Sequence, residues 1–161
     1  MDDVKSQRPA LLLWGIVALL VIALFAVAAY RAWPLLFPEI IQLAPLDPEC
    51  DLRQGACSAS FGEGRTLRFA LQPQHIPMLQ PLTLEVEVAQ LQPHRVEVDF
   101  AGVAMNMGFN RPQLHLQQEG RFVGKGTLPV CVLSQMEWEA RVLLYTDQGI
   151  LAAPFRFITY R

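Results

Sequence analysis

The chain has 161 residues, enough for one domain and a flanking segment, and its 13 Lys and Arg nearly balance its 15 Asp and Glu. Beyond Cys50, ten basic residues accompany ten acidic ones. This balance leaves no basic surface of the kind that binds a phosphate backbone, so the sequence excludes a nucleic-acid partner.

The first predicted element is a transmembrane helix over residues 11–30, which carry no charge. A helix of that length spans about 30 Å, the thickness of a bilayer's hydrocarbon core. Lys5 and Arg8 precede the span and only Arg31 follows it closely. This asymmetry favours a cytoplasmic N-terminus over residues 1–10. The sequence therefore predicts a single-pass protein of the inner (cytoplasmic) membrane with a periplasmic C-terminal domain.

A cleaved signal peptide is the alternative interpretation of this segment. Small residues at positions 26–29 could provide a cleavage site. However, the apolar run is longer than the 7–15 or so residues of a usual signal-peptide core, and this favours a retained anchor.

Residues 31–49 are predicted to form a linker, because they contain four prolines. Proline at this density favours a semi-rigid, extended spacer. Its aliphatic residues, Ile40 and Ile41 among them, are expected at the membrane surface or against a membrane partner protein.

The remaining residues, 50–161, show the alternation of β-strands. Apolar and polar residues alternate over 82–88 and 96–100, and further strands are predicted over 65–71, 112–118, 121–128, 137–146 and 150–158. Turn residues separate several of these runs. Seven or so short strands without an amphipathic helix predict an all-β domain, specifically an immunoglobulin-like antiparallel β-sandwich.

The sequence lacks the motifs of common catalytic and nucleotide-binding sites, so we expect no enzyme. A thiol oxidoreductase using Cys50 and Cys57 is disfavoured, because six residues separate the two thiols and no helix begins there to lower a cysteine pKa. In an oxidising compartment these two residues are expected to form a disulfide. Pairing of either one with Cys131 remains an alternative.

Methionine supplies the most distinctive chemistry of the domain. If the chain is extended at Met105 and Met107, the two side chains project to one side. Two adjacent thioethers suit Cu(I), which prefers sulfur to oxygen. The alternative is that these methionines fill gaps in the apolar packing.

Further soft or borderline donors could complete such a site, and an indole could cover it through a cation–π interaction. Trp138 is the candidate indole, although its main role is expected to be that of the buried tryptophan of a sandwich core. The predicted metal-site residues are thus Met105, Met107, His94, Cys131, Met136 and Trp138.

The segment 105–142 resembles the periplasmic domains of the FixH and YtkA-like family, which are similar in architecture to the CopC copper-carrier sandwich. The resemblance lies in Met-x-Met at 105–107, Gly-x-aromatic at 120–122 and Met-x-Trp at 136–138. The chain departs from the family pattern at its three cysteines.

The resemblance implies that Met105 and Met107 contact copper. A single N-terminal membrane helix also fits FixH-like proteins, which are linked to the assembly of copper-containing haem oxidases. We therefore expect a membrane-anchored Cu(I) carrier, or an assembly factor for a copper-containing respiratory oxidase. The alternative is a metal-free structural accessory subunit of a membrane complex.

Overall fold

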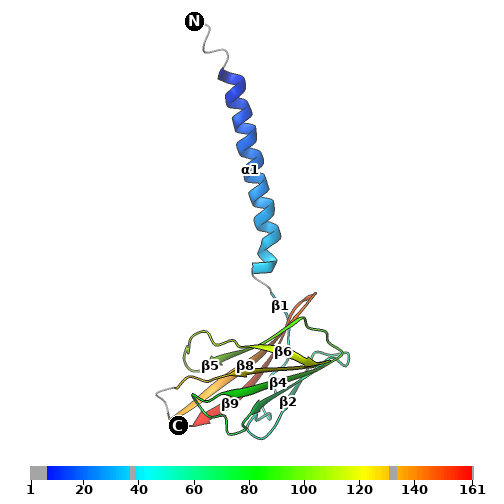
Figure 1. The fold of residues 1–161 in the computed structure, drawn as a ribbon, viewed down its shortest axis with the longest axis vertical. Helices are drawn as coiled ribbons and strands as arrows, with labels where there is room; N and C mark the ends of the chain where they lie inside the picture. Colours follow the sequence, from blue (N-terminus) through cyan, green and yellow to red (C-terminus); the bar gives the residue numbers. More distant parts are fainter. Residues whose placement is uncertain (1–6, 37–38, 131–133, 161) are drawn as a thin grey trace. The chain divides into compact units, whose positions relative to one another are not determined.

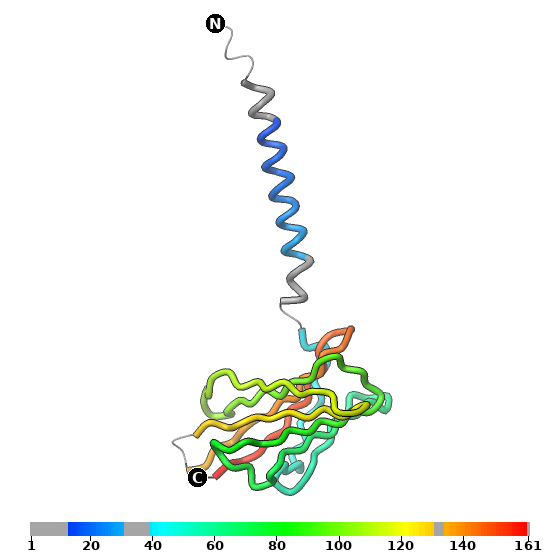
Figure 2. The backbone as a smooth tube through the Cα atoms, in the orientation of Figure 1, coloured from blue at the N-terminus to red at the C-terminus, as the bar shows by residue number. Residues whose placement is uncertain are grey.

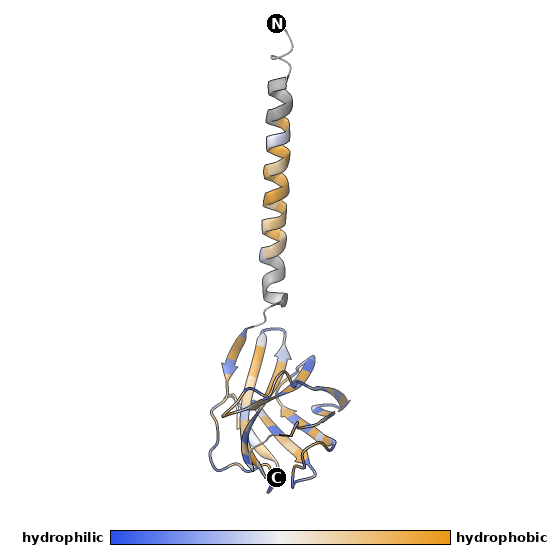
Figure 3. Cartoon of the chain, turned by 90° about the vertical axis from the view of Figure 1, so that its left-hand side faces the viewer, coloured by the Kyte–Doolittle hydropathy of each residue, from blue (hydrophilic) through white to orange (hydrophobic). Residues whose placement is uncertain are grey.

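The computed structural model describes residues 7–36, 39–130 and 134–160. They belong to two compact units, Met1–Glu39 and Ile40–Arg161. The first unit contains the helix α1 (Gln7–Leu36). Within it, Leu13–Tyr30 is apolar and long enough to cross a membrane. Figure 3 colours most of this stretch as hydrophobic. It suits a single-pass anchor or a signal sequence.

The second unit is a nine-stranded sheet (Figure 1). The strand order is β1-β9-β8-β5-β6-β7-β4-β3-β2. All neighbours are antiparallel except β1 and β9, which run parallel. The strands are β1 (Ile40–Leu43), β2 (Cys57–Ser60), β3 (Thr66–Gln72), β4 (Leu82–Ala89), β5 (Arg95–Gly102), β6 (Gln113–Gln118), β7 (Arg121–Gly126), β8 (Gln135–Thr146) and β9 (Gly149–Tyr160).

The sheet curls so that its two halves enclose the main apolar core. Strand β6 connects the halves, since it pairs with β5 on one side and with β7 on the other. Phe69 of β3 and Phe155 of β9 lie far apart in the strand order, yet their ring centroids are 5.4 Å apart. Alternating residues of β4 and β5 point into this core, as their sequence pattern predicts.

The all-β prediction is confirmed, but the immunoglobulin-like antiparallel sandwich is not. The reason is that the nine strands form one continuous curled sheet with a parallel pair at its edge. The strands predicted over 65–71, 82–88, 96–100, 112–118, 121–128, 137–146 and 150–158 correspond to β3 to β9.

Two short edge strands differ from the sequence prediction. Residues 40–43 belong to the predicted linker, whereas the structure pairs them with β9 as β1. Strand β2 was not predicted because its four residues, CSAS, are small and mostly polar, with little intrinsic preference for a strand. Both strands depend on a neighbour for their backbone hydrogen bonds, which a local pattern does not reveal.

The strands run between two opposite ends of this domain (Figure 2). One end, named here the methionine end, carries the loops 73–81, 103–112 and 127–130 and the last residue of β9. A backbone hydrogen bond from Leu79 N to Leu128 O, 2.9 Å long, connects two of these loops. The other end, named the β1 end, carries the start of β1 and the turns 61–65, 90–94 and 147–148.

Candidate thioether metal site

Met105 and Met107 lie in the loop that connects β5 to β6. Hydrogen bonds hold the base of the loop: Phe100 N donates to Asn110 O at 2.9 Å, and Val103 N donates to Glu137 O at 3.0 Å. Between the two methionines, Asn106 Oδ1 accepts a hydrogen bond from Gly108 N at 2.8 Å. The segment is therefore a bent loop, and the extended conformation considered from the sequence is not found.

The two methionines of the loop differ in their exposure. Met105 is 37% exposed, whereas Met107 is half-buried and packs against the main core. An open hollow of about 440 Å³ lies inside the loop and is lined by residues 101–108. One thioether of the motif thus faces the surface and the other faces the interior.

Gly102, at the end of β5, marks the point where methionine side chains converge. A β-carbon built on this glycine would lie 3.1 Å from Met107 Cγ, 2.5 Å from Met105 O and still closer to Met136 Cε. The Cγ and Cε atoms of methionine are the two carbons bonded to its sulfur. The structure therefore brings one sulfur-bonded carbon of Met107 and one of Met136 to the same place over Gly102, beside the Met105 carbonyl.

Met136 and Trp138 reach this region from β8. They are two residues apart on the strand, and both point into the core, with exposed fractions of 3% and 0%. Trp138 lies directly opposite Gly102 in the β5–β8 ladder. Its Nε1 donates a hydrogen bond to Thr159 Oγ1 at 3.0 Å, and both side chains are buried. Trp138 is thus a core residue adjacent to the methionine pair.

His94 does not join the methionines. It precedes β5 at the β1 end, where its backbone N donates to Tyr145 O at 3.0 Å. Its Nδ1 lies 3.8 Å from Asp147 Oδ1. Gly102 is at the opposite end of the eight-residue strand, roughly 26 Å from His94 at the usual rise per residue. The structure therefore does not place His94 beside the methionines. Cys131 lies outside the described residues.

Cys50 and Cys57 form a disulfide, the first of the pairings considered from the sequence. Inside the loop that they close, Leu52 is fully buried in the core. Asp51 and Arg53 form an ion pair with 3.0 Å between Oδ2 and Nη2. The loop is thus held by a covalent bond, an apolar contact and an ion pair.

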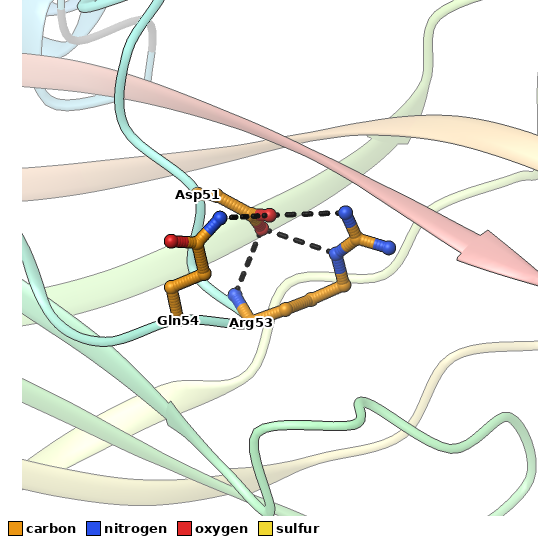
Figure 4. A network of polar contacts seen from close by, with 3 residues as sticks. All are labelled: Asp51, Arg53 and Gln54. Carbon is orange, nitrogen blue, oxygen red and sulfur yellow. Dashed lines mark hydrogen bonds and ion pairs between the residues drawn. The ribbon is translucent and has the colours of Figure 1, made fainter.

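The Asp51 carboxylate also accepts hydrogen bonds from the backbone N and the Nε of Arg53 and from Gln54 Nε2 (Figure 4). The hydrogen bond from the Arg53 side chain is the main reason why the pKa of Asp51 falls from its ordinary 3.8 to about 2. Backbone and amide donors act in the same direction. The carboxylate is therefore ionised at neutral pH and serves the structure of the loop.

Sequence reasoning missed two residues of this region. Gly102 was overlooked, although a glycine directly before a methionine-rich loop is a signal for close side-chain packing. Phe109 was also overlooked; it is 82% exposed and lies under the Arg111 guanidinium, 5.2 Å from the ring centroid. Exposure of so large a ring follows only from the path of the loop.

The described part of this region offers soft chemistry: two methionine side chains that meet over Gly102, a third methionine at the surface and a nearby backbone carbonyl. Thioether sulfur is an uncharged, soft donor that needs no deprotonation, and it suits Cu(I). Comparisons of the chain with protein-family models, with curated proteins and with solved structures found no match.

Proposed function

We propose that the protein is a membrane-anchored Cu(I)-binding protein whose site is built on Met107 and Met136, with Met105 as a third contact. The observation that carries the proposal is the convergence of two methionine side chains over Gly102. A third methionine occupies the same loop at the surface, where it would meet an incoming ion first.

The placement of the two inner methionines suits a site that must both hold and release an ion. Met136 belongs to β8 and is fixed by the core. Met107 belongs to a loop, which can adjust its position by small rotations about its backbone. Trp138 contributes an apolar wall opposite Gly102, and its ring would shield the ion from water.

The cellular setting is part of the same proposal. The apolar helix α1 supports an anchor in the inner membrane, and a disulfide persists in an oxidising compartment such as the periplasm. Together with the resemblance to FixH and YtkA-like domains, this supports a carrier or assembly factor for a copper-containing respiratory oxidase. An immunoglobulin-like class belongs to that resemblance, and the packing of β3 against β9 supports it.

Competition for Cu(I) against a chromophoric chelator, without oxygen and on the full chain in detergent, tests the site. The wild type should compete, and Met107→Leu and Met136→Leu should each weaken binding at least about tenfold, which corresponds to about 1.4 kcal/mol. Methionine-to-leucine replacement nearly conserves volume, so the fold should persist.

Met78→Leu is the matched control, because it makes the same change in the loop 73–81, none of whose atoms is among the three nearest to a β-carbon at Gly102. It should leave the affinity unchanged. A wild type that fails to compete for Cu(I), or equal affinities for all four proteins, would remove the copper site.

One observation favours a second candidate function, the metal-free accessory subunit. Met136 is almost completely buried and Met107 packs against the core, as expected of methionines that fill gaps. In that case Phe109, exposed on the same loop, would contact a partner subunit. The copper titration separates the two functions, because only the first predicts binding by the isolated protein.

A further inference from the structure

The β1 edge of the sheet combines three properties that single it out from the rest of the surface. Its three aliphatic side chains, Ile40, Ile41 and Leu43, are 47%, 52% and 59% exposed. Strand β1 is an edge strand of the sheet, so its outer backbone groups have no partner strand within the described residues. It contains no lysine, proline or acidic residue, the features that commonly protect an edge strand from association.

The strand is firmly part of the folded domain. It pairs with β9 through Ile40, Gln42 and Leu43, and Gln42 Nε2 donates to Phe61 O at 2.9 Å. Ile41 packs against Gly149, where an added β-carbon would lie 2.6 Å from Ile41 Cγ2. The exposed aliphatic side chains therefore belong to a strand that is fixed to the domain. A surface that binds these side chains thereby holds the domain as well.

The covalent distance to the apolar span limits what can cover this strand. Six helical residues follow Tyr30 in α1, about 9 Å of helix. Three more residues separate Leu36 from Ile40, a reach of about 14 Å when fully extended. If the span lies in a bilayer, β1 stays within roughly 23 Å of the hydrocarbon edge. At this range, even weak affinity for the headgroup region is amplified by the tether.

We propose that β1 rests on the bilayer surface, with Ile40, Ile41 and Leu43 in the interfacial region, so that the domain docks on the membrane through this edge. The inference rests on the membrane anchor of the proposed function and is independent of the copper site. Contact is limited to the interface, because the outer backbone groups of β1 would lose their hydrogen bonds to water in hydrocarbon.

Charges near β1 define which lipid suits the contact. Glu39 precedes the strand directly, and Asp147 at the same end has a fully exposed side chain. Glu63 nearby is also largely exposed, whereas Arg65, 4.0 Å from it, is mostly covered and donates a hydrogen bond to Gln42 Oε1 of β1 at 3.4 Å. These acidic residues disfavour an anionic surface. The contact should therefore be stronger on zwitterionic phosphatidylcholine than on anionic phosphatidylglycerol.

Spin-label accessibility on the full chain tests the proposal. The label is placed at Leu43→Cys in a Cys131→Ser background, in phosphatidylcholine nanodiscs, with Val103→Cys at the methionine end as the control. Both native side chains are exposed, so both sites should tolerate the label. Collision rates with oxygen and with a water-soluble nickel chelate are measured by electron paramagnetic resonance.

We expect the oxygen-to-nickel ratio to be several-fold higher at position 43 than at position 103, and lower when phosphatidylglycerol replaces phosphatidylcholine. Equal nickel accessibility at the two positions would overturn the proposal. So would a label at position 43 that neither reagent reaches, because protein would then cover the strand. A chain that does not remain in nanodiscs would refute the anchor itself.

Two further measurements keep the outcome clear. If thermal unfolding shows that Leu43→Cys destabilises the domain, the label moves to Ile40→Cys on the same strand. The copper titration of the wild-type protein reports separately on the methionine end, so failure of one result leaves the other standing.

Discussion

Gly102 lies directly opposite Trp138 in the β5–β8 ladder, and the space left by its missing side chain is occupied by Met107 and Met136. This relationship joins the end of β5 and the methionine loop that follows it to the start of β8, which is distant in sequence. It also means that Met136 and Trp138 belong both to the candidate site and to the core. Changes at Gly102 should therefore affect both.

Gly102→Ala is expected to lower the free energy of unfolding by about 1–3 kcal/mol, the usual cost of overpacking. The added β-carbon would lie 2.5 Å from Met105 O, a backbone atom that can move only if the loop moves. Chemical denaturation measures the effect. Gly55→Ala is the control, since a β-carbon there meets nothing within 4 Å. Equal stabilities of the two variants would show that the loop adapts freely. If Met107 and Met136 hold Cu(I), Gly102→Ala should also weaken its binding.

Trp138→Phe is expected to cost more than its loss of volume alone. It removes the hydrogen bond to Thr159 Oγ1 and leaves a buried hydroxyl without a partner, at about 1–3 kcal/mol. Thr159→Val should also destabilise, because it orphans the indole N–H. The double variant Trp138→Phe/Thr159→Val should cost less than the two single changes together. Strict additivity in urea denaturation would argue against this hydrogen bond.

Acidification should weaken the loop around Asp51. The pKa of Asp51 is lowered to about 2 in the folded protein, mainly by the Arg53 hydrogen bond, and returns to about 3.8 on unfolding. A depressed pKa stabilises the folded state above the unfolded value, and this contribution is lost as pH falls from about 4 through 2. Asp51→Asn should therefore be less stable than wild type at pH 7, and the gap should narrow towards pH 2.

Thermal unfolding of both proteins across this pH range measures the gap. Glu119→Gln makes the same carboxyl-to-amide change in the exposed turn between β6 and β7, and it should leave the stability profile close to that of wild type. A gap between Asp51→Asn and wild type that stays constant with pH would show that the ion pair contributes little.

Removal of the disulfide should destabilise the domain moderately. Cys50 and Cys57 are separated by seven positions, and closing so short a loop stabilises by about 2–3 kcal/mol in the chain-entropy description. Cys50→Ala/Cys57→Ala should lose this amount in chemical denaturation. Dithiothreitol should destabilise the wild type similarly and leave the double variant unaffected. A reductant effect on the double variant would point to other chemistry.

The sequence by itself determined the elements whose signal is local. The apolar run in α1 identifies a potential membrane helix, because a helix surrounded by lipid needs apolar residues on its whole surface. The alternation in β4 and β5 identifies half-buried strands, because burial of one face requires an apolar residue at every second position. The spacing of the remaining apolar runs likewise predicts the other strands from β3 to β9.

Tertiary pairing decided the rest. Strands β1 and β2 are short and lack alternation, so only their neighbours β9 and β3 make them strands. Met136 joins Met107 because β5 and β8 are adjacent, and His94 is excluded because β5 carries it to the opposite end. The sequence gives the chemistry of each side chain directly, but strand order decides which side chains meet. Strand order depends on long-range packing, which no short segment of the sequence contains.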